Sequence, residues 1–140
     1  MRIIGLDVGS VTVGVAVSDE MGVIAQPAGT WRRKDVERDM AEMCRLIAEY
    51  QAELILIGLP LNMNGSEGPS AQMAREFAAA LAEATDTEII FRDERLSTVA
   101  AEKILLSGDV SRKKRKQVID SMAAVFVLQG YLDSLHNSAL

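Results

Sequence analysis

The chain has one cysteine, one histidine and three prolines among its 140 residues, and only 4% of its residues are aromatic. The lone thiol, Cys44, cannot form an internal disulfide, and we expect it to pack in a helix rather than act as a nucleophile. The N-terminus lacks a basic segment followed by an apolar core, and no apolar run approaches the length of a membrane span. We therefore expect a cytoplasmic protein without a membrane partner.

The composition that remains is enough to build a core, because 49% of the residues are hydrophobic. We expect one domain over residues 1–140, with a tail that frays from about residue 135. The net charge of −5 argues against a protein that simply coats nucleic acid. The basic residues are nevertheless clustered at 32–34 and in one consecutive run: Arg112, Lys113, Lys114, Arg115 and Lys116.

The first nineteen residues predict two antiparallel strands, with the acid Asp7 near the end of the first. Residues 2–8 and 13–18 are apolar runs, and the turn formers Gly9, Ser10 and Thr12 lie between them. Because side chains alternate along a strand, Gly5 and Asp7 share a face on the first strand. We expect another element to approach that face closely beside Asp7.

The remaining pattern predicts an α/β fold. We expect a third strand over 23–30, interrupted by Pro27 and suited to a sheet edge, a helix over 35–50 and a buried strand over 54–58. Further elements are expected as a helix over 69–84, a strand over 88–91, a helix from 97 or 98 to about 107, and a last helix over about 116–134. Three strands followed by helical crossovers indicate a mixed five-stranded sheet, with antiparallel front hairpins, parallel strands behind them and helices on both faces.

Three acids occupy positions where an apolar residue would cost less. Asp7 ends the first strand, and Glu94 follows the fifth. Asp120 lies on the helix stripe that also carries Ala123, Ala124, Val127 and Tyr131, and that stripe faces the sheet. Each acid alone would also fit an ordinary role, as a turn cap, an ion pair with a neighbouring arginine, or an acceptor for backbone groups.

Together, three carboxylates without histidine or thiolate suit Mg²⁺ or Mn²⁺ better than zinc. Two such ions about 4 Å apart can support phosphodiester cleavage, so we predict metal-binding and catalytic roles for Asp7, Glu94 and Asp120. The basic run 112–116 comes directly before Asp120 and is expected to hold the phosphate backbone, although such runs are often only a solvated surface. Arg95, Asn62 and Asn64 are expected to help place the strand.

Four segments resemble one family in order and spacing: LDVGSVTVGVAVSD, IGLPLNMNGSEGPSA, RDERLST and KKRKQVIDSMAAVFVLQGYLD. They are similar to the YqgF or RuvX family, a branch of the RNase H-like superfamily related to the RuvC Holliday junction resolvases. The resemblance covers nearly the whole chain. It implies an RNase H-like fold and a metal-dependent nuclease that matures the 5′ end of pre-16S rRNA. The family's acidic positions fall on Asp7, Glu94 and Asp120, and Asn64 stands where the family pattern has Asp.

Three other functions are weighed against this interpretation. A sugar-kinase-like ATPase shares the opening strand and glycine turn, but it needs a second domain that this length cannot supply. A Holliday junction resolvase would use the same acids on branched DNA, and an RNA-binding ribosome-assembly factor would not use them catalytically. We expect nucleic acid as the partner, with precursor rRNA favoured over branched DNA, ribosomal particles as a further partner, and a monomer or weak homodimer.

Overall fold

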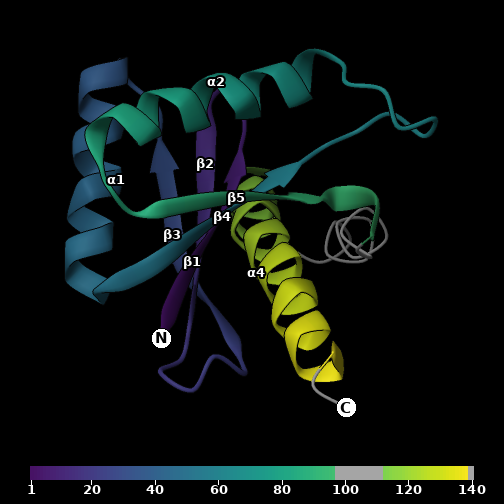
Figure 1. Cartoon of the computed structure of the whole chain (residues 1–140). Coiled ribbons are helices and arrows are strands. Elements are labelled where there is room, and N and C mark those ends of the chain that lie inside the picture. Colours follow the sequence, from purple (N-terminus) through teal and green to yellow (C-terminus); the bar gives the residue numbers. More distant parts are fainter. Residues whose placement is uncertain (97–111, 139–140) are drawn as a thin grey trace.

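Five strands form one mixed sheet in the order β3-β2-β1-β4-β5 (Figure 1). The computed structural model describes residues 1–96 and 112–138, without the side chains of residues 96, 112–120 and 138. The strands are β1 (Arg2–Val8), β2 (Thr12–Ser18), β3 (Ala25–Arg32), β4 (Ala52–Leu59) and β5 (Glu88–Asp93). The helices are α1 (Val36–Tyr50), α2 (Pro69–Ala84), α4 (Arg112–Ser138) and a short 3-10 helix (Glu94–Leu96) that follows β5.

The strand directions confirm the predicted mixed sheet. β1 pairs with β2 and β2 with β3 in antiparallel fashion, whereas β1 with β4 and β4 with β5 are parallel. The edge strand β3 contains Pro27, as predicted, and its pairing with β2 shifts register between Val15 and Ala16. Proline is tolerated there because an edge strand leaves one row of backbone groups without a ladder partner.

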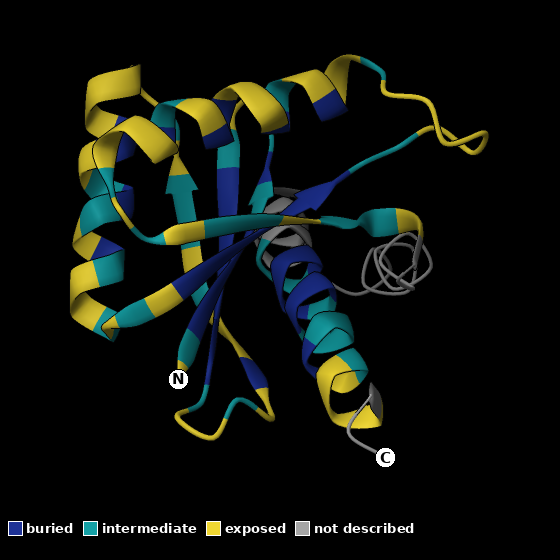
Figure 2. Ribbon diagram, viewed as in Figure 1, coloured by how far each residue is buried: buried dark blue, intermediate teal, exposed yellow. Residues whose placement is uncertain are grey.

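Each face of the sheet has its own core. Leu6, Ile57 and their neighbours pack under α1 and α2, while Ile3, Leu56 and their neighbours pack under α4. Both sides of β4 are therefore buried, which explains its unbroken apolar sequence. Figure 2 shows the buried strands between helices whose outer surfaces are exposed.

The helix boundaries agree with the sequence in the first half of the chain. Asp35 caps α1 by accepting a hydrogen bond from the Arg38 backbone N–H at 2.8 Å, and Pro69 opens α2. The last helix differs, because α4 begins at Arg112 rather than near residue 116. The tail expected to fray from about 135 is helical as far as Ser138, and the helix expected over about 97–107 lies outside the described residues. No helix among residues 1–96 and 112–138 is long and apolar enough to cross a membrane.

Candidate functional site

Asp7 lies at the carboxyl end of β1 on the face covered by α4. Ile3, on the same face, belongs to the core under α4, whereas Leu6 and Val8 belong to the opposite core. The predicted alternation is thus confirmed, and the partly buried Asp7 pairs with Gly14 of β2. On the other side, the pairing of Leu6 with Ile57 brings Asp7 level with Gly58 at the end of β4. Asp7 therefore lies between two strand positions that carry no side chain.

Glu94 reaches this same place from the end of β5. An ideal Cβ on Gly58 would lie 2.5 Å from Oε1 of Glu94 and 3.1 Å from its Cδ and Cγ atoms. The absence of a side chain at position 58 thus leaves the space that the Glu94 side chain occupies. Gly58 shares the α4 face with Leu54 and Leu56, so the structure brings Glu94 and Asp7 to one end and one face of the sheet.

The packing of α4 sets the position of the third acid along the sheet. An ideal Cβ on Gly5 would lie 2.9 Å from Cβ of Leu128 and 3.3 Å from the carbonyl oxygen of Ala124, which confirms the predicted close approach. Farther along α4, Nε2 of His136 lies 3.1 Å from the carbonyl oxygen of Gly22, in the turn at the opposite end of β2 from Gly14. Along its sequence, α4 thus runs from the end of the sheet that carries Asp7 to the opposite end, where β1 begins (Figure 1).

Position 120 is one turn before the fully buried Ala123 and Ala124, so its backbone lies toward the Asp7 end of α4. The side chain of Asp120 is outside the described part of the chain, and its contact with the other acids stays a prediction. The same holds for the basic run 112–116, whose backbone forms the first turns of α4 instead of the expected preceding loop. Among the described residues no group of three or more metal-binding side chains occurs.

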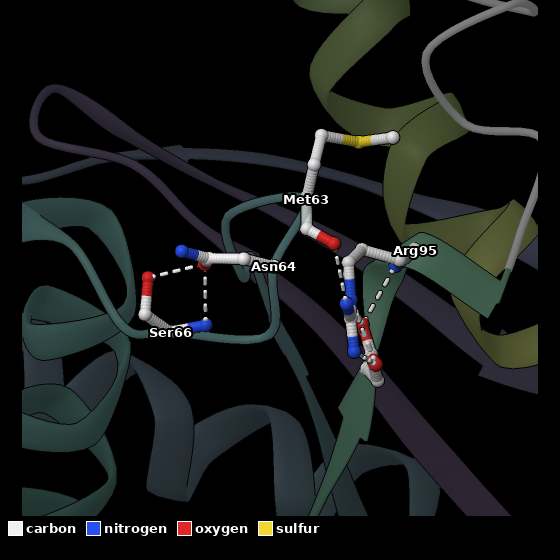
Figure 3. Close-up of polar contacts among 5 residues, drawn as sticks. Met63, Asn64, Ser66 and Arg95 are labelled. Atoms are coloured by element: carbon white, nitrogen blue, oxygen red, sulfur yellow. Dashed lines mark hydrogen bonds and ion pairs between the residues drawn. The ribbon is translucent and has the colours of Figure 1, made fainter.

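Arg95 connects the loop after β4 to the end of β5, next to Glu94 (Figure 3). Nη1 of Arg95 donates to the carbonyl oxygen of Met63 at 3.1 Å, and Nη2 donates to Oδ2 of Asp93 at 2.7 Å. The hydrogen bonds from Arg95 to Asp93 lower the pKa of Asp93 despite its partial burial, and the bond from Arg95 to Met63 holds the loop at the end of β5. Asn64 accepts hydrogen bonds from the backbone N–H and Oγ of Ser66 at 3.0 and 2.6 Å, so its side-chain oxygen serves the turn.

A buried acid that the sequence analysis missed supports the turn after Asp7. Asp39 is 1% exposed, and its carboxylate accepts hydrogen bonds from Nε1 of Trp31 at 2.9 Å, Nε of Arg33 at 3.2 Å and the Lys34 backbone N–H at 2.9 Å. Burial opposes ionisation, but these donors outweigh it and lower the pKa of Asp39. Arg33 also donates from Nη1 to the carbonyl oxygen of Gly9 at 3.0 Å. Asp39 therefore orients the arginine that holds the β1–β2 turn.

Trp31 belongs to the same hydrogen-bond network. Its ring packs against the core under α1 and α2 and lies 5.4 Å from Nζ of Lys34. Trp31 therefore covers the core, and its indole N–H donates to Asp39. Of the basic cluster 32–34, Arg33 is committed to Asp39 and Gly9, whereas Arg32 and Lys34 are exposed.

Comparisons with known proteins agree with this architecture. A family model described as "RuvX: Holliday junction resolvase" matches residues 1–134. A relative from Clostridium beijerinckii is 51% identical over 96% of this chain and 98% of its own, and one from Halalkalibacterium halodurans is 54% identical over 95% and 96%. Both carry the name "Putative pre-16S rRNA nuclease".

Solved structures show the same fold at low sequence identity. Thermus thermophilus RuvC in complex with a Holliday junction substrate matches with a TM-score of 0.65 and 13% identity, over 99% of this chain and 98% of that one. The fowlpox virus resolvase bound to junction DNA matches with a TM-score of 0.52 and 13% identity, over 96% and 99%. The RNase H-like fold is thereby confirmed, and the chain belongs to the RuvX family.

Proposed function

We propose that this protein is a metal-dependent nuclease that processes the 5′ end of pre-16S rRNA. The observation that carries the proposal is the meeting of Asp7 and Glu94 on one face at one end of the sheet, in a chain whose relatives bear the name of such a nuclease. Acids from distant segments are costly to gather on a partly buried surface unless a cation or substrate uses them. This role in rRNA processing implies a cytoplasmic location.

The donors suit Mg²⁺ or Mn²⁺, because Asp7 and Glu94 offer only carboxylate oxygens to the site. Asp7, Glu94 and Asp120 would hold the ions in a two-metal site. When bound, the ions supply an activated water and neutralise charge on the phosphate. The protein's own part is positional: Gly58 admits the Glu94 side chain, and the Arg33 bond to Gly9 fixes the turn that follows Asp7.

The phosphate backbone would lie on the first turns of α4. Residues 112–116 place five cations just before Asp120, and a helix presents consecutive residues around its whole circumference. Only some of these five can therefore face one strand of nucleic acid. Arg95, Asn62 and Asn64 would lie on the other side of the bound nucleic acid. Asn62 and Asn64 shape the loop after β4, and Arg95 fixes this loop to the end of β5.

The test is cleavage of a precursor RNA that spans the 5′ end of 16S rRNA, with Mg²⁺, with Mn²⁺ and with EDTA. We expect no cleavage in EDTA and a loss of about 100-fold or more in Asp7→Asn, Glu94→Gln and Asp120→Asn, because a bound ion supplies several kcal/mol of charge stabilisation that is lost when a ligand no longer holds it. Glu53→Gln is the matched control, since Glu53 is exposed near the start of β4, at the other end of the sheet. Full activity in EDTA, or in all three variants, contradicts the proposal.

A second candidate is a Holliday junction resolvase, which the description of the matching family model favours. The same protein preparation should then be tested on a four-way DNA junction and on the precursor RNA. Paired, symmetric incision of the junction with no RNA cleavage would favour the resolvase. If Asp7→Asn still complements a deletion strain while neutralisation of residues 113–116 does not, the protein is an RNA-binding assembly factor instead.

A further inference from the structure

Met63 stands out as an apolar side chain held in solvent beside the proposed site. It is 93% exposed, the highest value among the large hydrophobic residues that the structure describes. In Figure 3 its side chain points away from Asn64, Ser66 and Arg95 and does not fold back onto the loop. A single exposed hydrophobic residue needs no explanation in general, so the question is whether the loop around Met63 holds it there.

The loop is constrained on both sides of Met63. The Asn62 backbone N–H donates to the carbonyl oxygen of Ser66 at 2.9 Å, and the Gly65 N–H donates to the carbonyl oxygen of Asn62 at 2.8 Å. The side chain of Asn62 also donates to Oγ of Ser66 at 2.9 Å, and Leu61 forms an isolated bridge with Glu67. Gly65 has a φ of 88°, a conformation that few other residues adopt readily. The tip is therefore a defined turn that presents Met63.

The same residue is tied directly to the strand end that carries Glu94. The carbonyl oxygen of Met63 accepts from Arg95, and Arg95 forms three side-chain hydrogen bonds of 2.7 to 3.1 Å with Asp93. Asp93 and Arg95 flank Glu94 in sequence, and the Glu94 carboxylate lies over Gly58. The backbone of Met63 is thus anchored to the strand end that leads into Glu94, and the Met63 side chain projects from this anchor.

We propose that Met63 contacts the face of an unstacked base next to the phosphodiester bond that is cut. The inference rests on the proposed nuclease function, and it names the substrate class as nucleic acid with an unpaired or displaced base at that position. A thioether chain is apolar, polarisable and slim, which suits contact with the flat face of any base, and apolar side chains are inserted at unstacked steps in other nucleic-acid complexes. Such contact is tolerant of sequence because every base presents a π face.

The geometry favours this occupant over a protein partner. Met63 is a lone apolar residue between the polar side chains of Asn62 and Asn64, whereas a protein interface would require a contiguous apolar patch. The guanidinium of Arg95 lies below it, donates to the Met63 carbonyl oxygen and is ion-paired with Asp93. A single slim apolar side chain therefore fits the face of one base better than it fits a protein interface.

The experiment measures binding of full-length protein carrying Asp7→Asn, which prevents cleavage, to oligonucleotides that contain 2-aminopurine at successive positions. We expect Met63→Ala to bind single-stranded RNA about 5-fold more weakly and to abolish the position-specific change in 2-aminopurine fluorescence. Its affinity for a continuous duplex should change less than 2-fold, and Met63→Leu should retain most of the signal. Met21→Ala is the matched control, because Met21 is 80% exposed in the turn between β2 and β3.

The outcomes separate the two proposals. If Met63→Ala matches the parent protein in affinity and fluorescence while the wild type cleaves RNA and Asp7→Asn does not, the inference about Met63 is wrong and the nuclease function stands. If the wild type neither binds nor cleaves nucleic acid, the proposed function fails and the inference fails with it. Unchanged RNA binding together with lost complementation by Met63→Ala would assign the residue to a protein partner and also overturn the inference.

Discussion

Replacing Gly58 with alanine displaces Glu94 without removing its charge. The new Cβ would lie 2.5 Å from Oε1 and 3.1 Å from Cγ and Cδ of Glu94, whereas ordinary van der Waals contact begins near 3.4 Å. The carboxylate must therefore move by about 1 Å, and a misplacement of that size can cost about 100-fold in rate. The end of a flexible side chain can shift without disturbing the strand, so we expect the free energy of unfolding to change by less than about 1 kcal/mol.

A double-mutant cycle with Glu94→Gln attributes the loss to that carboxylate. Initial rates of RNA cleavage under saturating metal, and urea unfolding curves, would be measured for Gly58→Ala, Glu94→Gln and the double variant. If Gly58→Ala acts through Glu94, it lowers the rate in the wild type but adds little in the Glu94→Gln background. Full cleavage by a stably folded Gly58→Ala variant, or losses that simply multiply in the double variant, would refute the placement of Glu94 at the reacting centre.

Three further predictions concern packing, charge and binding. Gly5→Ala pushes a Cβ to 2.9 Å from Cβ of Leu128, and overpacking at this strand–helix contact should cost about 1–3 kcal/mol in urea unfolding; an unchanged midpoint would contradict the close approach of α4. Asp39→Ala leaves Arg33 without its buried carboxylate, so thermal and urea unfolding should show a loss of about 3 kcal/mol at pH 7. Because the folded-state pKa of Asp39 is lowered from its ordinary value of 3.8, the wild type should keep this advantage above pH 4, and the gap between wild type and variant should shrink as the pH falls through the lowered value; a gap that does not shrink on acidification would contradict the assignment. Neutralising Lys113 and Lys114 together should weaken the salt dependence of binding to single-stranded RNA. The slope of log affinity against log salt should become shallower by about 0.7 for each phosphate contact that is lost, and an unchanged slope would place the phosphates elsewhere.

The sheet and the position of Asp7 could be predicted because they depend on local patterns. Alternation along β1 places Ile3, Gly5 and Asp7 on one face whatever packs there, and small residues on that face indicate a close neighbour. The continuous apolar run of β4 likewise requires cover on both sides. These rules need no knowledge of distant residues, so the sequence was sufficient for them.

Asp39 was missed although the signal was present. It lies three residues after Val36, four before Met43 and seven before Leu46, on the same stripe that was interpreted as the apolar face of α1. The argument that singled out Asp120 applies equally to Asp39, but its partners Trp31 and Arg33 are on another element and become neighbours only in the fold. A buried acid is therefore detectable by periodicity, whereas its purpose is not.

The start of α4 and the role of the β4–α2 loop show what local rules do not provide. Lysine and arginine have a good helix propensity, so a helix that includes the basic run from Arg112 was open to prediction. The bond between Arg95 and the Met63 carbonyl joins segments 32 positions apart. No periodicity in the sequence indicates such a contact.

The proposed acids come from β1, from the end of β5 and from α4. Of these elements, β1 is translated first and α4 last. Until α4 leaves the ribosome and Leu128 settles over Gly5, the face of the sheet that carries Asp7 has no cover from this helix. With Asp120 as the proposed third acid, the site of a nascent chain is incomplete until α4 has been made and has packed on the sheet. For a protein proposed to process ribosomal RNA precursors, synthesis on one ribosome would therefore be finished before the protein acts on the precursor of another.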